Sequence, residues 1–149
     1  MKMPVARLAI VLLAALASPV LLAQQADGAK PAAAEPAFKA HVLSKGELEA
    51  LLAKPEKVLL IDVRRPDEVT AIGGFPVYLS IQAKELESST AWIPKDRTIV
   101  TVSNHAGRAG KAADLLASKG FKVAGAVGAE TYEKDGGKIA HLKAPPPKT

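Results

Sequence analysis

Apolar and polar residues along this chain follow two patterns, one typical of buried strands and one of amphipathic helices. Continuous apolar runs at 58–61 and 98–102 predict strands that are buried on both faces. Further strands are predicted at 78–81 and 121–127, with a short edge strand at 42–43. The run at 98–102 is the most strongly apolar, and we expect it in the middle of the sheet.

Segments with helical spacing separate these strands. Ser44 and Glu47 have the spacing of a capping box, which predicts a helix that ends before Pro55. A second helix is predicted over 111–119, closed by Gly120 in the left-handed conformation. Shorter helices are expected after the polar turn 62–68, at 83–87 and at 128–134. Strands that alternate with helices predict an α/β fold with a central, mainly parallel sheet and helices on both faces.

The first residues of the chain have the pattern of an export signal. Residues 1–23 start with Lys2 and Arg7, continue as an apolar run and end near Ala23 or Ala26, small residues that suit cleavage. The apolar run is short for a membrane span, so cleavage is preferred to an uncleaved anchor, and no stable membrane insertion is expected afterwards. This predicts a periplasmic or secreted protein.

The rest of the chain divides into a linker, one domain and a tail. Residues 24–38 are rich in alanine and proline and are interpreted as a linker, and residues 144–149 as a proline-rich tail. Between them, 39–143 has the length of one compact domain. The chain contains no cysteine, so this domain forms no disulfide.

Charge and histidine content exclude several classes of partner. The net charge of +5 falls by two when the predicted signal peptide is removed, and the remaining charges are dispersed, which argues against a nucleic-acid partner. The three histidines, His41, His105 and His141, have no metal-ligand spacing. We therefore expect no metal and no cofactor.

The most informative segment begins where the strand at 98–102 ends. A loop of small and polar residues follows, and residues with high helix propensity come after it. Such a junction points backbone N–H groups at one spot, with the helix dipole behind them, and predicts a cradle for an anion. The candidate anion-binding residues are Ser103, Asn104, His105, Ala106, Gly107 and Arg108.

Two further candidate residues lie after the strand at 58–61. Asp62 and Arg64 have two open interpretations. They can stabilise the strand end through hydrogen bonds and ion pairing, or Arg64, like Arg108, can add positive potential at the mouth of the cradle.

Four motifs follow one another over most of the domain. The first motif, in residues 60–68, is an Asp-Val-Arg turn at a strand end, and the second, in 73–81, is a loop with glycine and proline that leads into a strand. The third is the strand, loop and helix of residues 99–116 described above. The fourth, in residues 128–136, is a glycine-rich turn followed by a helix. In this order and spacing they resemble the rhodanese-like domain family. Gly74 and Tyr132 depart from that family's pattern, since histidine and tryptophan are common there.

The resemblance implies a chemistry that this chain lacks. Active members carry sulfur as a persulfide on a cysteine at the first position of the loop, taken from thiosulfate or a related donor, and here Ser103 stands at that position. A hydroxyl is far less acidic than a thiol with a pKa of about 8.5 and holds no transferable sulfur. The six-position loop also has the length of sulfur-transferring members, whereas phosphatase relatives carry one residue more.

Two functional hypotheses remain. The first is an exported, catalytically degenerate binding or accessory module, whose loop holds a small oxyanion or a carboxylate or sulfur-bearing group of a protein partner. The alternative is a weak enzyme, either a thiosulfate sulfurtransferase type or a hydrolase that uses Ser103. The hydrolase lacks the Gly-x-Ser-x-Gly context of a nucleophile elbow.

Overall fold

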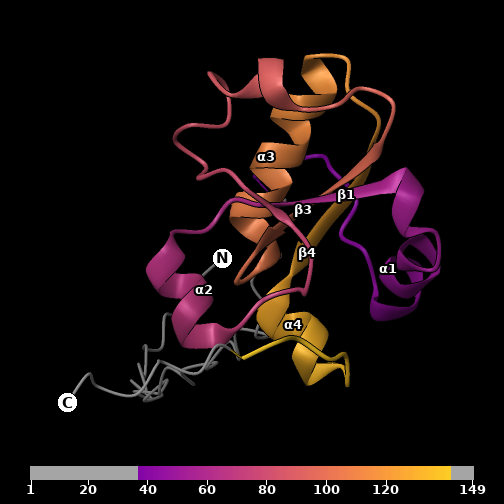
Figure 1. The fold of residues 1–149 in the computed structure, drawn as a ribbon, viewed down its shortest axis with the longest axis vertical. Coiled ribbons are helices and arrows are strands. Elements are labelled where there is room, and N and C mark those ends of the chain that lie inside the picture. Colours follow the sequence, from indigo (N-terminus) through magenta and orange to yellow (C-terminus); the bar gives the residue numbers. More distant parts are fainter. Residues whose placement is uncertain (1–36, 142–149) are drawn as a thin grey trace, which may run out of the picture. The chain divides into compact units, whose positions relative to one another are not determined.

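The central feature of the fold is a parallel sheet of four strands in the order β2-β1-β3-β4 (Figure 1). The computed structural model describes residues 37–141. The strands are β1 (Val58–Asp62), β2 (Leu79–Ser80), β3 (Thr98–Ser103) and β4 (Val123–Gly128). The α/β fold predicted from the sequence is confirmed, with a sheet that is entirely parallel.

Helices connect the strands, as parallel pairing requires. They are α1 (Lys45–Leu52), α2 (Pro66–Ile72), α3 (Ala106–Ser118) and α4 (Ala129–Lys134), with short 3-10 helices η1 (Pro55–Lys57) and η2 (Thr90–Trp92). The predicted capping box starts α1: the backbone N–H of Ser44 donates to Glu47 Oε2 at 2.8 Å, and the Glu47 N–H donates to the Ser44 hydroxyl. The Ser44 N–H, followed by the Ser44 hydroxyl and the His41 ring, donates to the Glu47 carboxylate and lowers its pKa to about 2.

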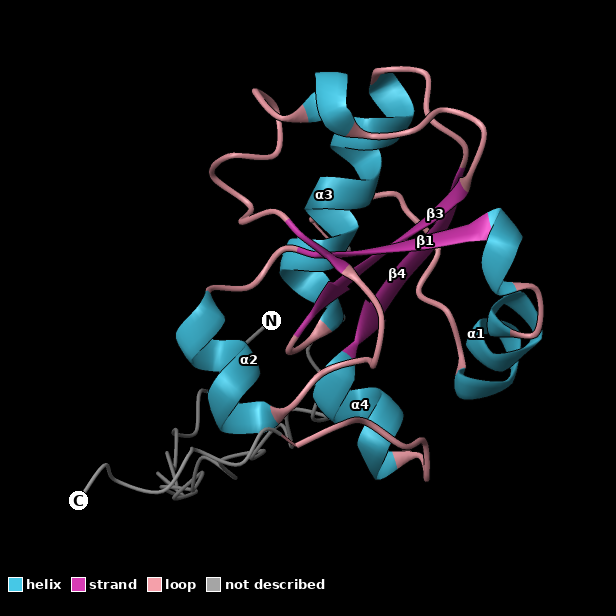
Figure 2. Cartoon of the chain, in the orientation of Figure 1, coloured by secondary structure: helices cyan, strands magenta, loops and turns pink. Residues whose placement is uncertain are grey.

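The sheet has a hydrophobic core on each face, and alternation along the central strands divides their side chains between the two. Leu60 and Val100 pack against Leu48 of α1 and Tyr132 of α4. On the other face, residues of β1 and β3 pack with Leu116 of α3. Figure 2 shows α3 on one side of the strands and α1 on the other. Burial on both faces explains the continuous apolar runs of β1 and β3.

The register of the strands brings two loops together at one edge of the sheet. Asp62 of β1 lies opposite Val102, and Ser103 lies opposite Gly128 of β4. Because the carboxyl ends of parallel strands meet at the same edge, the turn after β1 lies beside the loop after β3. The candidate residues after these strands are therefore neighbours, although about 40 positions separate them in sequence.

Several element boundaries differ from the sequence predictions. Residues 83–87 form turns instead of a short helix, with the Glu85 N–H donating to Gln82 O. The expected edge strand at 42–43 is reduced to one bridge, between Val42 and Ala126. The helix expected over 111–119 begins earlier, at Ala106, because backbone hydrogen bonds continue the helix through the glycines at its start. Gly120 follows α3 with φ +83°, as predicted.

Residues at the amino-terminal end of the described range contact α3. The ring of Phe38, the last residue of the expected linker, packs against Gly110 of α3, and the Lys39 N–H donates to Asp114 at 2.7 Å. The predicted signal peptide, most of the linker and the tail at 144–149 lie outside the described residues. Within 37–141 no helix is long and apolar enough to cross a membrane.

Candidate functional site

Ser103 lies at the end of β3 with its side chain fully inside the protein, 0% exposed. Its hydroxyl accepts a hydrogen bond from the backbone N–H of Ala109, in the first turn of α3, at 3.0 Å. The same hydroxyl donates to the backbone carbonyl oxygen of His105. The Ser103 hydroxyl therefore uses its O–H as a donor and one of its lone pairs as an acceptor. These two hydrogen bonds connect the end of β3 to the start of α3.

The loop after Ser103 ends in the first turn of α3, whose leading N–H groups have no partner within the helix. No side chain caps α3 at His105. The loop rests on Gly128, where an added Cβ would lie 3.0 Å from both Asn104 O and His105 Cα. The nearby Glu130 N–H donates to Asn104 O at 3.2 Å. Close contact with a glycine therefore holds the loop in place.

Asp62 and Arg64 form a buried ion pair directly below the loop. Arg64 is 0% exposed and Asp62 1% exposed. The guanidinium donates through Nε and Nη2 to both carboxylate oxygens, at 2.9 Å to Oδ1 and 2.6 Å to Oδ2, and the Arg64 backbone N–H donates to Oδ1 at 3.1 Å. In this geometry the charge of Arg64 is neutralised inside the protein instead of being presented at the mouth of the loop.

A chain of hydrogen bonds joins this pair to the loop. Arg64 Nη1 donates to Asn104 Oδ1 at 3.1 Å, and Asn104 Nδ2 donates to Glu68 Oε1 at 2.9 Å. Arg108 then donates to both carboxylate oxygens of Glu68, at 2.9 Å from Nη1 to Oε2. The five side chains, from Asp62 to Arg108, form a continuous network that clamps the loop to the turn after β1.

Glu68 is the residue of this network that the sequence analysis missed. It was assigned only to the polar turn 62–68, and its partner Arg108 lies 40 residues away. Arg108, followed by the backbone of Arg65, lowers the pKa of Glu68 to about 2. Glu68 in turn raises the pKa of Arg108. Glu68 was recognisable as an N3 acidic residue of α2, but nothing in the sequence indicates its distant partner.

Beside the loop, a basic pocket with a volume of about 220 Å³ opens at the carboxyl edge of the sheet. We call it the basic pocket; it is lined by Val63, Arg65, Gln82, Ala83, Lys84 and Arg108. The side chain of Arg108 remains 41% exposed while it pairs with Glu68. Two further cations, Arg65 and Lys84, have nearby partners in Asp67 and Glu85. The pocket thus offers guanidinium and ammonium donors to a ligand from solvent.

The histidines do not converge at this site. His105 is exposed, and its ring lies 3.6 Å from Glu130 on the side of α4. His41 pairs with Glu47 at 2.9 Å and His141 with Glu133 at 2.7 Å. In the part of the chain that the structure describes, no cluster of three potential metal ligands occurs.

Solved structures of the same fold come from several organisms. A rhodanese-related protein from Thermoplasma volcanium is 18% identical, over 69% of this chain and 98% of that chain, with a TM-score of 0.58. A rhodanese-like domain protein from Staphylococcus aureus is 20% identical, over 68% and 98%, with a TM-score of 0.57. A thiosulfate sulfurtransferase from Pseudomonas aeruginosa is 23% identical, over 68% of this chain and 20% of its own length, with a TM-score of 0.53. At these identities the likeness shows the fold alone.

Family membership comes from the sequence itself. No curated protein matches the chain. The family model described as "Rhodanese-like domain" matches residues 44–129, from the cap of α1 to the start of α4. This range contains the turn after β1, the Ser103 loop and the basic pocket. The chain belongs to the rhodanese-like domain family, and it does so without a cysteine.

Proposed function

We propose that this protein is a rhodanese-like binding module that performs no sulfur transfer of its own. In this proposal Ser103 occupies the position at which active relatives carry the sulfur-bearing cysteine. The observation that carries the proposal is the state of the Ser103 hydroxyl, which is buried and makes two hydrogen bonds within its own loop. A hydroxyl nucleophile needs a neighbouring base, and the partners of this hydroxyl are a backbone carbonyl oxygen and a backbone N–H.

The same geometry argues against hydrolysis by Ser103. The Ser103 hydroxyl donates its hydrogen bond to the backbone carbonyl oxygen of His105, and a carbonyl oxygen cannot act as a general base. The His105 ring points toward Glu130 instead. A serine hydrolase requires the opposite arrangement, with the imidazole on the serine hydroxyl.

The basic pocket supports the binding part of the proposal. It lies next to the loop and is lined by Arg65, Lys84 and Arg108, whose donors suit a small oxyanion or a carboxylate of a protein partner. The network behind it holds Arg108 in one orientation, so little side-chain entropy remains to be lost when an anion binds. A pocket with a positioned guanidinium and without a nucleophile suits recognition.

Anion binding at this pocket predicts a measurable stabilisation. We expect 50 mM sulfate or thiosulfate to raise the melting temperature of the full chain by about 4 °C beyond the effect of chloride at equal ionic strength, which corresponds to a site with a Kd of about 10 mM. Arg108→Ala should remove most of this increment, measured by differential scanning fluorimetry.

The matched control for this experiment is Lys134→Ala, which removes an exposed cation at the end of α4. Sulfate also stabilises proteins generally by exclusion from their surface, and this effect is equal in both variants. If Arg108→Ala and Lys134→Ala respond to sulfate alike, the basic pocket does not bind the anion.

We also propose that the protein is exported, which rests on the signal-like residues 1–23. Fractionation of a Gram-negative host that expresses the full chain tests this. The expected result is a periplasmic protein whose new amino terminus, read by mass spectrometry, follows Ala23 or Ala26. A full-length chain in the cytoplasm or in the membrane fraction would contradict export.

A further inference from the structure

A cavity larger than the basic pocket lies away from the Ser103 loop, along the outer edge of β1. We call it the edge groove. Its volume is about 330 Å³, and its lining includes Leu52, Leu59, Val77, Tyr78, Leu79 and Arg97. It shares no residue with the basic pocket. The edge groove is mostly apolar, and a single cation, Arg97, lines it.

An unpaired piece of strand borders the edge groove. The edge strand β2 pairs only with Ile61 and Asp62, so the first half of β1, Val58–Leu60, has no strand beside it on this side within the described residues. The Val63 N–H donates to Val102 of β3, and N–H directions alternate along a strand, so the Leu60 N–H faces the edge groove. Such an edge can accept another extended chain.

The apolar side chains around this edge are unusually accessible. Val77, in the loop before β2, is 82% exposed and lines the edge groove. Leu52 and Leu59, which also line the edge groove, are partly buried. A side chain from an added strand would cover Val77 and fill the space between it and Leu59, and removing this apolar surface from water favours binding.

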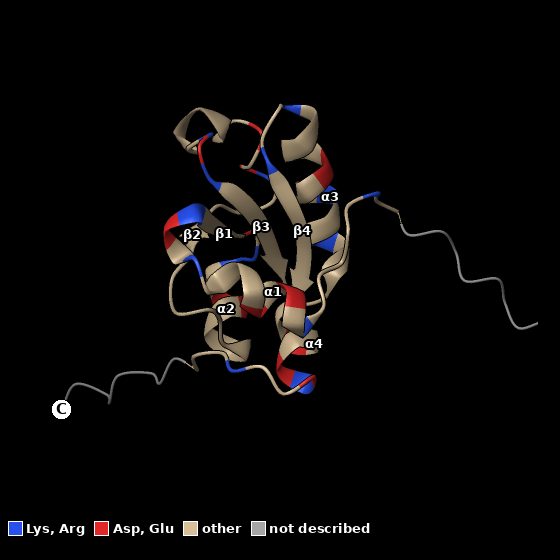
Figure 3. Ribbon diagram, turned by 90° about the vertical axis from the view of Figure 1, so that its right-hand side faces the viewer, with Lys and Arg blue, Asp and Glu red and all other residues tan. Residues whose placement is uncertain are grey.

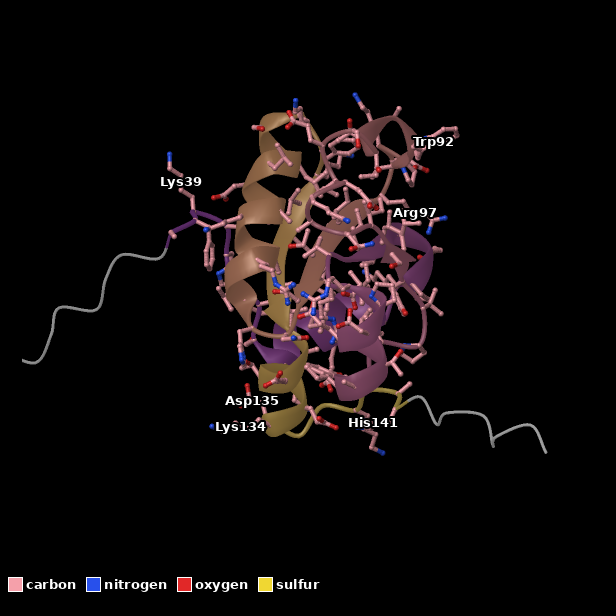
Figure 4. The ribbon with its side chains drawn as sticks, turned by 90° about the vertical axis from the view of Figure 1, so that its left-hand side faces the viewer. Lys39, Trp92, Arg97, Lys134, Asp135 and His141 are labelled. Atoms are coloured by element: carbon pink, nitrogen blue, oxygen red, sulfur yellow. The ribbon has the colours of Figure 1, made fainter. Side chains whose placement is uncertain are left out.

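The charge around the edge groove selects for an acidic ligand. Arg97, which is partly buried, forms no hydrogen bond or ion pair with any residue in 37–141. Figure 4 shows its side chain directed outward, on the same side of the domain as Trp92. The segment 54–57, which contains η1, has two basic residues, Lys54 and Lys57, and one acidic residue, Glu56, so it carries a net positive charge. Figure 3 shows both basic and acidic segments in the loops that lead into β3 and β4.

We propose that the edge groove binds an extended segment of a partner protein, which adds to β1 as a short strand, inserts apolar side chains between Leu59 and Val77 and pairs a carboxylate with Arg97. The Leu60 N–H on this edge provides a main-chain hydrogen bond, since the Val58 N–H is already held by Pro55 O. The apolar lining selects alternate side chains, and the unpaired cation selects the acidic group. This binding is independent of the Ser103 loop and of any anion held there.

The test uses the full chain and two fluorescein-labelled hexapeptides of alternating valine and threonine, one ending in glutamate and one in lysine. By fluorescence anisotropy the glutamate peptide should bind about tenfold more tightly than the lysine peptide. Arg97→Glu should reverse this preference. Val77→Asp should weaken binding of the glutamate peptide about tenfold, and since Val77 is highly exposed, this change should leave the domain folded.

Lys134→Glu is the matched control, because it makes the same kind of charge reversal on an exposed residue of α4 and should bind both peptides as the wild type does. Hydrogen exchange supplies a second measurement: the glutamate peptide should slow exchange of the Leu60 amide about tenfold, as expected for strand addition. The proposal is overturned if neither peptide binds, if Arg97→Glu keeps the wild-type preference, or if the Leu60 amide is unprotected in the complex. Sedimentation showing that copies of this chain pair through Val77 would also overturn it.

Discussion

Replacing Ser103 by cysteine should convert the wild-type protein, which we expect to show no thiosulfate:cyanide sulfur transfer, into a measurable sulfurtransferase. The new thiol would lie at the start of α3, next to the Ala109 N–H, where the helix dipole and this donor stabilise a thiolate. We expect Ser103→Cys to exceed the wild-type rate at least about hundredfold, because the thiolate supplies the nucleophile that the loop lacks. Thiocyanate formation measures the rate.

Two controls make this result specific. Ser103→Ala removes the hydroxyl and adds no thiol, so its rate should equal that of the wild type. The engineered thiol would be the sole cysteine in the chain, so alkylation with iodoacetamide should abolish the gained activity. Wild-type turnover that Ser103→Ala abolishes would refute the binding-module proposal. A folded but inactive Ser103→Cys would show instead that the loop lacks the shape that sulfur transfer requires.

Removing the carboxylate of Asp62 should produce the largest loss of stability of any single substitution at this site. Asp62→Ala leaves the buried guanidinium of Arg64 with the Asn104 side chain as its one hydrogen-bond partner among residues 37–141. An uncompensated buried charge of this kind costs about 3–5 kcal/mol in the free energy of unfolding. Urea denaturation followed by circular dichroism measures the loss.

The double replacement Asp62→Leu with Arg64→Met distinguishes a buried charge from a simple loss of contacts. If the unpaired guanidinium causes the cost, removing both partners should restore much of the stability that Asp62→Ala loses. Glu68→Gln should cost only about 1 kcal/mol, because its partner Arg108 is partly exposed. A cost of Asp62→Ala no larger than that of Glu68→Gln would contradict the role assigned to the buried pair.

Local sequence patterns predicted those elements whose causes are local. The capping box of Ser44 and Glu47 involves residues three apart, and α1 begins there. The apolar runs of β1 and β3 reflect burial on both faces, which the sequence records directly. Residues 83–87 do not form the predicted helix, because so short a segment gains little from helical hydrogen bonds alone. The side chain of Leu86 is buried although its backbone lies in a turn.

The sequence selected several residues of the candidate site but none of the contacts between its two segments. The Ser103–Arg108 loop and the Asp62–Arg64 pair were both selected from sequence, and the structure places them side by side. The role of Glu68, the brace between Asn104 and Arg108, could not be predicted, since it depends on two loops meeting across the edge of the sheet.

By itself, the sequence determined the α/β class, the position of the loop between a strand and a helix, and the absence of cysteine, because apolar periodicity and residue identity are local properties. Only the tertiary structure decided that the Ser103 hydroxyl turns inward to the His105 carbonyl and that Arg64 is neutralised out of solvent. It also decided that, within residues 37–141, β2 pairs with only the last two residues of β1. These features depend on strand register and on contacts between distant segments, which no local pattern encodes.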